Sequence, residues 1–236
     1  MRYRRRYNVA LATGLTSTAV LGWLAGSFVN EGAVYATKAA GFFVVLTAAV
    51  VAVAGDQHPY PRFGAANVVT TIRAILAALV AGLIGYPASA PMLWWVIGFT
   101  MMFAALDGID GWVARTTRMA SGYGARFDME TDAAFILVLS ILVWQHGKAG
   151  AWVLLCGLMR YAFVAAGQVL PWLAAPLRPT RRGRTVAVVQ LLGLSIALAP
   201  AISVPASSAV AAVTLAALTW SFAIDVAWLA RQHRAS

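Results

Sequence analysis

The chain has 236 residues, of which 61% are hydrophobic and only 11% charged, and its mean hydropathy is +0.76. This composition excludes an ordinary soluble domain and is typical of a protein that crosses a membrane several times. The net charge of +10 does not indicate a nucleic-acid partner. The arginines gather at the termini and at every second loop, where they would meet anionic lipid headgroups.

Eight apolar runs of membrane-spanning length, roughly 17–25 residues each, follow one another along the chain. They lie at about 8–29, 38–54, 67–86, 92–113, 129–145, 150–172, 185–202 and 207–229. The expected fold is therefore all-α, a polytopic membrane bundle of about eight helices. No hydrophilic stretch is long enough for a separate domain, so the activity is expected within or at the bilayer. Cys156 is the only cysteine, which excludes an internal disulfide.

The first two runs predict an N-terminal transmembrane helical pair, residues 1–55, whose role the sequence does not indicate. The basic start and the apolar stretch after it are similar to a signal peptide, but the length of that stretch and the lack of a clear cleavage site favour a retained helix. Residues 56–66 mix proline, aromatic and charged side chains. They predict a cytoplasmic interfacial link, and residues 67–236 predict the core.

The third run opens with Asn67-Val-Val-Thr70-Thr-Ile-Arg73. Steps of three residues place these polar side chains on one helix face, which is expected to point into the bundle. Asparagine and threonine near a helix start are also common capping residues, so this segment alone does not decide between a site and a cap.

Four aspartates stand in a fixed frame that extends from the end of the fourth run to the start of the fifth. The frame reads Asp107-Gly-Ile-Asp110-Gly111-Trp-Val-Ala114-Arg115, then eight residues, then Gly124-Ala-Arg-Phe-Asp128-Met-Glu-Thr-Asp132. Carboxylates are costly next to hydrocarbon, so they predict a functional site. Each pair, at i,i+3 or i,i+4, shares a helix face. Together the pairs would gather oxygen ligands for Mg²⁺ or Mn²⁺.

An ionic network of these acids with Arg115, Arg118 and Arg126 is the structural alternative. Such a network has no need of glycine and alanine at fixed offsets. Glu130 is not expected to join a metal site, because a two-residue step turns a helix by roughly 200°.

The frame resembles the signature of the CDP-alcohol phosphotransferase family, D-x2-D-G-x2-A-R-x8-G-x3-D-x3-D, at every fixed position. The Asn67 segment resembles the N-x-x-T-x-x-R start of the first core helix in that family. The resemblance covers about residue 64 to the C-terminus, the six helices typical of the family. It implies transfer of a phosphoalcohol unit from a cytidine diphosphate carrier to an acceptor hydroxyl, with release of CMP.

The resemblance also implies residue roles. Asp107, Asp110 and Asp128 are expected to ligate two divalent ions, with Asp132 near the second ion and acting as the general base. The nucleotide would be contacted by Asn67, Thr70, Gly111, Ala114, Arg115, Ser121 and Gly124.

Arginines on later helices are candidates for acceptor binding. Arg160 lies in the middle of an apolar run, where an arginine costs on the order of 2.5–3.5 kcal/mol on insertion scales, so it should face a polar cavity. The stretch with Arg182 and Arg184 resembles a basic stretch of phosphatidylglycerophosphate synthases, although anchoring at the headgroups explains it equally well. Asp225 is expected to be the structural partner of a neighbouring arginine.

The most plausible donor is CDP-diacylglycerol and the acceptor a small polar or phosphorylated alcohol. The alternatives are a CDP-choline or CDP-ethanolamine:diacylglycerol phosphotransferase, a catalytically silent scaffold, and a cation-coupled transporter. A transporter would spread its acids along a pathway. The protein is predicted to be a multi-pass protein of the cell membrane. The aspartate site is predicted on the cytoplasmic side by the positive-inside rule, because the loops on the opposite side contain only two basic residues, Lys38 and Lys148. A homodimer is compatible with the sequence.

Overall fold

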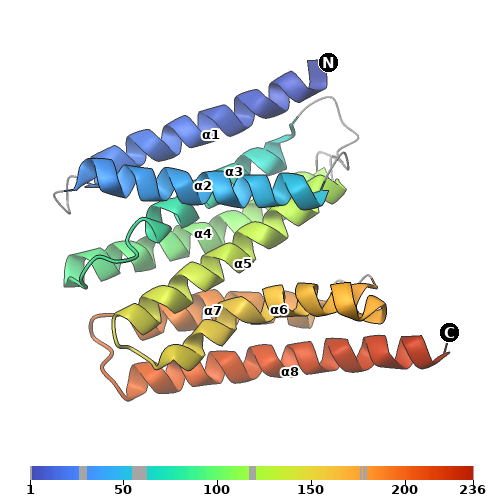
Figure 1. Ribbon diagram of the computed structural model, residues 1–236. Helices are drawn as coiled ribbons and strands as arrows, with labels where there is room; N and C mark the ends of the chain where they lie inside the picture. The colour runs from blue at the N-terminus through green and yellow to red at the C-terminus, as the bar shows by residue number, and fades with distance from the viewer. Residues whose placement is uncertain are drawn as a thin grey trace. The chain divides into compact units, whose positions relative to one another are not determined.

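The computed structural model describes residues 2–26, 31–54, 63–116, 121–175, 177 and 180–235, with the side chains of 2–8, 53–54, 110–115 and 235 left aside. All regular structure in these ranges is helical, as the sequence predicts (Figure 1). The helices are α1 (Arg2–Gly26), α2 (Gly32–Ala54), α3 (Ala65–Ala81), α4 (Ala90–Thr116), α5 (Gly122–Gln145), η2 (Ala151–Leu154), α6 (Leu155–Val169), η3 (Pro171–Ala174), α7 (Arg181–Leu198) and α8 (Ala206–Ala235).

Each of the eight apolar runs corresponds to one α-helix. Within the described residues, five segments are long and apolar enough to cross a membrane: Val9–Gly26, Gly32–Ala52, Ala90–Ile109, Ala151–Val169 and Ala206–Arg234. The other three α-helices are not among these candidate membrane spans, and the sequence of each gives a reason. Helix α3 has only 17 residues, α5 carries the charged site in its first half, and α7 begins with three arginines. The chain is a multi-pass helical membrane protein.

The chain divides into two compact units. The first unit contains residues 1–86 and 98–135, and so includes α1, α2, α3 and the adjoining parts of α4 and α5. The second contains residues 87–97 and 136–236, with α6, α7 and α8. The functional division predicted at the 56–66 link stays a prediction, because residues 55–62 lie outside the described part of the chain.

In the first unit, α1 and α2 pack against each other and both pack against α3. Helix α3 accepts two neighbours because its buried side chains are small; Ala74, Ala77 and Ala78 are fully buried. Small residues let helix backbones approach closely where no water drives the association. The chain enters α3 through Gly64, whose φ of 86° is a conformation that glycine adopts without strain.

A group of polar contacts joins the beginning of α2 to the end of α3. We call it the clasp, and its side chains are those of Glu31, Tyr35, Lys38 and Tyr86. Lys38 donates to the carbonyl oxygen of Ile84 at 3.1 Å, and its ammonium lies 4.3 Å from the centroid of the Tyr86 ring. Tyr86 in turn donates its hydroxyl to Glu31 at 2.9 Å, and Tyr35 donates to a carbonyl near the end of α3. The clasp supplies partners for carbonyls that a helix end leaves without an intrahelical bond.

In the second unit, α7 and α8 pack side by side. Lys148, in the turn after α5, donates to the carbonyl oxygens of Ala199 at 2.9 Å and Ile202 at 2.6 Å, just beyond α7. Ser207 donates to the carbonyl oxygen of Lys148 at 2.6 Å. These bonds tie the turn before η2 to the turn between α7 and α8.

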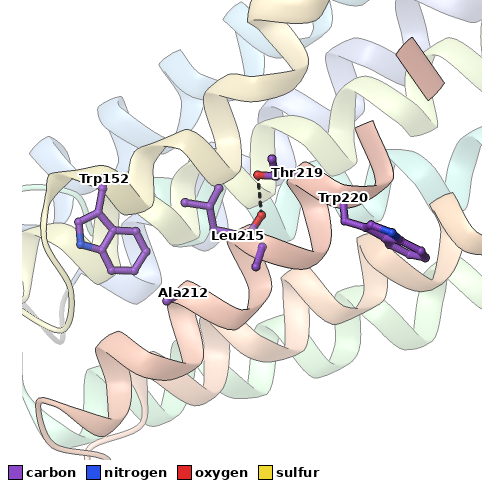
Figure 2. Close-up of a pocket in the computed structure, with 6 residues that line it drawn as sticks. Trp152, Ala212, Leu215, Thr219 and Trp220 are labelled. Carbon is purple, nitrogen blue, oxygen red and sulfur yellow. Dashed lines mark hydrogen bonds between the residues drawn. The ribbon is translucent and has the colours of Figure 1, made fainter. Parts of the chain in front are cut away.

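The second unit also has an open groove of about 450 Å³. Trp152 of η2 and five residues of α8 line it, with Trp220 at one end (Figure 2). Its one hydroxyl side chain, Thr219, donates to the carbonyl oxygen of Leu215 within α8 at 2.8 Å. The groove therefore offers hydrocarbon contacts, and its lining contains no group suited to phosphoryl chemistry.

Candidate active site

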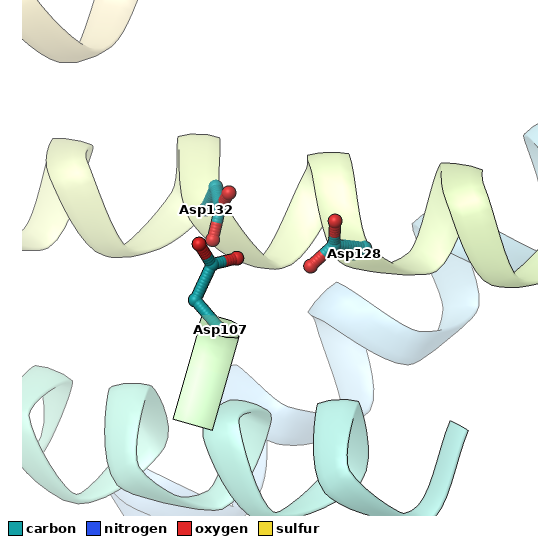
Figure 3. Close-up of side chains that lie close together, drawn as sticks. All are labelled: Asp107, Asp128 and Asp132. Atoms are coloured by element: carbon teal, nitrogen blue, oxygen red, sulfur yellow. The ribbon is translucent and has the colours of Figure 1, made fainter. Parts of the chain in front are cut away.

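Three aspartates converge in the first unit. Asp107 comes from α4, and Asp128 and Asp132 lie one turn apart on α5 (Figure 3). Carboxylate oxygens of the three residues all lie within 4.8 Å of one another. Their side chains are partly exposed, at 29%, 39% and 24% respectively. The donor set fits a hard divalent cation, because Mg²⁺ and Mn²⁺ prefer carboxylate oxygens and keep some water ligands.

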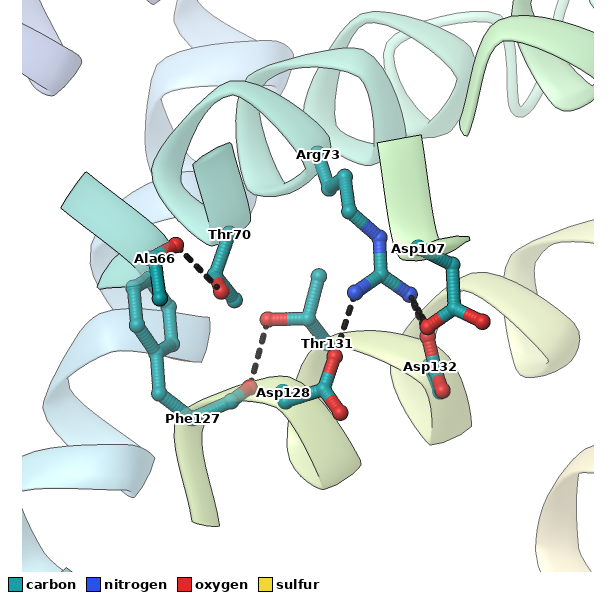
Figure 4. A network of polar contacts seen from close by, with 8 residues as sticks. All are labelled: Ala66, Thr70, Arg73, Asp107, Phe127, Asp128, Thr131 and Asp132. Atoms are coloured by element: carbon teal, nitrogen blue, oxygen red, sulfur yellow. Dashed lines mark hydrogen bonds and ion pairs between the residues drawn. The ribbon is translucent and has the colours of Figure 1, made fainter. Parts of the chain in front are cut away.

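Among the described side chains, one arginine pairs with all three aspartates of this cluster. Arg73 of α3 is fully buried, and its guanidinium pairs with Asp107 at 2.9 Å and also with Asp128 and Asp132 (Figure 4). Its Cζ atom lies 4.5 Å from the centroid of the Phe103 ring. The planar, always charged guanidinium suits both the fork of carboxylates and the aromatic face.

Acids outnumber bases among the described side chains of this group. Three aspartates pair with one arginine that is out of contact with water, and the side chains of 110–115 are not counted. Carboxylates this close repel one another, and the repulsion is stronger where solvent is partly excluded. This excess of described acids is what a cation site requires.

The polar face of α3 lies inside the bundle, as its spacing predicts. Asn67, Thr70 and Arg73 are all at least 95% buried. The helix is capped by Gly64 without a side-chain bond, so Asn67 and Thr70 are not its cap. Instead the Thr70 hydroxyl donates to the carbonyl oxygen of Ala66 at 3.1 Å, and the Asn67 amide donates to the carbonyl oxygen of Phe63.

Two residues of the predicted nucleotide set, Ser121 of the loop and Gly124 of the motif, have structural roles at the start of α5. Ser121 precedes the helix and accepts a hydrogen bond from the Gly124 amide at 3.1 Å, which is N-capping geometry. A Cβ atom on Gly124 would lie 2.7 Å from Oδ1 of Asn67, so a larger residue at position 124 would displace the Asn67 side chain. Any role of either residue in nucleotide binding stays a prediction.

The remaining predicted site residues lie elsewhere or outside the described side chains. Asp110, Gly111, Ala114 and Arg115 belong to α4 by their backbone, but their side chains are not described. The arginines predicted for acceptor binding, Arg160 of α6 and Arg182 and Arg184 of α7, all belong to the second unit.

Arg182 makes the contact that the sequence suggested for Asp225. Its Nη2 pairs with the Asp225 carboxylate, and its Nε donates to the Ser221 hydroxyl at 3.2 Å. The prediction that Asp225 is the structural partner of a nearby arginine is confirmed.

The sequence predicts that Arg73 lies on the polar face of its helix, but it does not predict which residues Arg73 contacts. The signal was present, because an arginine within an apolar helix needs a charged partner. Those partners are distant in the sequence: two lie 55 and 59 residues further along the chain, on α5, and the third is Asp107 of α4. Glu130, which the sequence excludes from metal binding, lies outside the group of three described acids that could hold an ion.

Comparison with known proteins gives the family. No curated protein and no solved structure matches the chain significantly. The family described as CDP-alcohol phosphatidyltransferase matches residues 63–224, more than half of the chain, and this range contains the whole aspartate frame and the Asn67 segment. This chain belongs to the CDP-alcohol phosphatidyltransferase family.

Proposed function

We propose that the protein transfers a phosphatidyl group from CDP-diacylglycerol to the hydroxyl of a small polar or phosphorylated alcohol, releasing CMP. Membership of the family gives the coarser part: a membrane-embedded transferase of phosphate-containing groups that acts on a CDP-alcohol and an alcohol acceptor. The observation that carries the proposal is the convergence of Asp107, Asp128 and Asp132 within 4.8 Å.

The aspartates would hold the divalent ions. Asp107, Asp128 and Asp132, joined by Asp110, supply carboxylates for two Mg²⁺ or Mn²⁺ ions. When bound, such ions neutralise the charge of the pyrophosphate and of the departing CMP. Arg73 pairs with all three described carboxylates and keeps them together.

The transfer step forms one bond and breaks one. The acceptor oxygen attacks the phosphorus that carries the diacylglycerol, and the bond from that phosphorus to the CMP oxygen breaks, with the electron pair leaving on CMP. Asp132, in its anionic form, takes the proton of the acceptor hydroxyl as general base. Much of the rate enhancement comes from positioning the two substrates, because phosphoryl transfer depends on alignment of the reacting groups and not on covalent catalysis by the protein.

The nucleotide would lie against α3, α4 and the start of α5. Asn67 and Thr70 line the buried face of α3, Gly111 and Ala114 are small where a base must approach the backbone, and Arg115 can pair with a phosphate. Ser121 and Gly124 complete this set. The support for this part is the family motif itself.

For the acceptor we propose binding by Arg160, with Arg182 or Arg184 close by. Three cationic side chains would favour an acceptor that bears its own phosphate. A charge-assisted hydrogen bond contributes roughly 1.5–3 kcal/mol. Arg160→Ala should therefore raise the acceptor KM about tenfold or more and leave the KM for CDP-diacylglycerol unchanged. An unchanged acceptor KM would remove Arg160 from the acceptor site.

The protein is expected in the cell membrane, with its active site on the cytoplasmic side. The arginine bias supports this orientation. Topology reporters placed after residues 120 and 180 should both give cytoplasmic signals, and a reporter after residue 148 should give an external one. A cytoplasmic signal at residue 148 would contradict the predicted number of membrane-spanning helices. It would also contradict the prediction that the loops near residues 120 and 180 lie on the same side of the membrane.

The experiment that tests the proposal is an assay of the purified protein. The protein is incubated with labelled CDP-diacylglycerol, Mg²⁺ or Mn²⁺ and a panel of alcohols, and CMP release is followed. Release that depends on both the metal and one alcohol supports the proposal. Activity only with CDP-choline or CDP-ethanolamine and diacylglycerol would assign the reverse arrangement of donor and acceptor.

A further inference from the structure

A buried apolar cluster lies behind the aspartate site. It combines three side chains of α2 with two of α3 and three of α5, all no more than 7% exposed: Phe43, Leu46, Val50, Ala74, Ala78, Tyr123, Phe127 and Ala134. Helix α2 lies outside residues 63–224, the range that the family matches. An element outside the family range thus packs against α3 and shares one buried apolar core with residues of α5.

The cluster is adjacent to the site in sequence as well as in space. Phe127 precedes Asp128, and Ala74 follows Arg73. At about 100° per residue, Asp128 and Asp132 lie roughly 100–180° around α5 from the stripe of cluster residues. One side of α5 therefore presents the carboxylates while another faces the buried apolar cluster. The direction in which the carboxylates point depends on how α5 is seated.

Phe43 is the residue at which the N-terminal helices meet this core. It is 99% buried, and the tip of its ring reaches Gly14 of α1. A Cβ atom on Gly14 would lie 2.6 Å from Cζ of Phe43 and 3.0 Å from Cγ2 of Thr71 on α3. A side chain at position 14 would displace the ring or α1, so glycine allows α1 to lie against Phe43 here. Phe43 thus contacts α1 and belongs to the core that includes residues of α3 and α5.

The clasp fixes α2 along α3 at the other end. Tyr35 donates to the Leu79 carbonyl oxygen, and a Cβ atom on Gly82 would lie 3.1 Å from the Tyr35 ring. With Lys38 bonded to Ile84, the start of α2 cannot slide along α3 without breaking these contacts. The depth at which Phe43 enters the core is thereby set.

We infer that the N-terminal helical pair is a positioning element of the active site, and that Phe43 seats α3 and α5 so that Arg73, Asp128 and Asp132 converge. A simple membrane anchor would not require such a contact. Helix α2 does present some side chains outward, such as Val45 at 69% exposure, but Phe43 points into the core. The inference rests on the proposed role of the aspartates in binding divalent ions.

The test measures Mn²⁺ binding to the purified full-length protein by electron paramagnetic resonance, together with thermal unfolding. Mutation of residues that orient metal ligands typically weakens affinity about 10–100-fold. Because Phe43 acts through one more layer of packing, we expect Phe43→Ala to raise the Mn²⁺ Kd about tenfold. Phe43→Leu should fall between this variant and wild type. Val45→Ala, on the outward side of the same helix, should bind Mn²⁺ like wild type.

The outcomes separate this inference from the proposed function. If Phe43→Ala or Phe43→Leu lowers the unfolding temperature but keeps the wild-type Mn²⁺ affinity, the N-terminal pair contributes only to stability and the inference is wrong. If Phe43→Ala fails to fold, Phe43→Leu and Gly14→Ala, which displaces the ring, decide by the same measurement. If the wild-type protein itself binds no Mn²⁺, the proposed cation site fails first, and this inference fails with it.

Discussion

Two ion-pair clusters of this protein combine arginine and aspartate in different proportions. In the second unit, Arg182 meets the single carboxylate of Asp225, both side chains are about three-quarters buried, and the charges cancel. In the first unit, fully buried Arg73 pairs with three carboxylates. One acid for one base is sufficient for a structural pair between two helices. Three acids around one base, among the described side chains, form a group that a cation can join.

The repulsion among the three carboxylates can be estimated. Two carboxylate charges at 4.8 Å, the upper limit of the separation among these oxygens, repel by about 3.5 kcal/mol at an effective dielectric constant of 20, and less with solvent screening. The contacts with Arg73 offset this repulsion, and a bound cation would offset it further. The two clusters therefore differ in the ratio of described acids to bases, and each of the following predictions tests whether that ratio marks a cation site.

The largest effect is expected from Asp128→Asn. The amide keeps the shape of the side chain but binds a divalent ion far more weakly, so CMP release should fall by more than about 100-fold, given that even outer-shell changes reach that range. The measurement is metal-dependent CMP release from a preparation that remains folded in detergent. Glu130→Gln makes the same chemical change on the same helix outside the cluster and should retain activity. Turnover near the wild-type rate in folded Asp128→Asn would remove this residue from the metal site.

The second effect concerns the stability of the cluster without metal. Arg73→Ala leaves three close carboxylates without their counter-ion, and removing one partner of a buried ion pair costs about 3–5 kcal/mol. We expect the lower part of that range, because the acids are partly exposed. Mg²⁺ should restore much of the loss, since it replaces the missing positive charge.

The measurement for Arg73→Ala is thermal unfolding in detergent, with chelator and with Mg²⁺. Arg126→Ala, at an exposed position on α5, is the matched control and should unfold like wild type in both conditions. A loss of stability in Arg73→Ala that is identical with and without Mg²⁺ would show that the arginine fills space and does not balance charge.

The sequence alone could predict the helices and one half of this site. Apolar runs of spanning length predict the helices whatever their neighbours, and the i,i+4 spacing places Asp128 and Asp132 on one face of α5. Both features depend only on local geometry, which is why they could be predicted.

The role of Arg73 could not be predicted in the same way. Its pairing depends on how α3 lies against α4 and α5, and spacing within one helix carries no information on that. The same holds for Phe43, since apolar side chains all around α2 give no sign of which one enters the core. Ser121 and Gly124 show a further limit. The family resemblance predicts both as nucleotide contacts, whereas in the folded chain Ser121 caps α5 and Gly124 leaves room for the Asn67 side chain.

The smallest effect is expected from breaking the balanced pair. Asp225→Asn and Arg182→Ala should each lower the free energy of unfolding by no more than about 1 kcal/mol, because both groups keep some contact with solvent. The loss should be independent of Mg²⁺, since no surplus charge is created for the ion to neutralise. Unfolding curves with chelator and with Mg²⁺ check this directly, and a loss that Mg²⁺ reverses would show that the two clusters are not different in kind.

Arg182→Ala and Asp225→Asn should also differ in their effect on the acceptor KM. If Arg182 contacts an acceptor phosphate, Arg182→Ala should raise the acceptor KM about tenfold, whereas Asp225→Asn removes a competing anion and should not raise it. The two substitutions would then cost similar stability but act differently on KM, which a purely structural pair cannot do. Titration of the acceptor at saturating CDP-diacylglycerol provides the measurement. If both variants keep the wild-type acceptor KM, Arg182 only joins α7 to α8, and recognition of an acceptor phosphate would fall to Arg160 and Arg184.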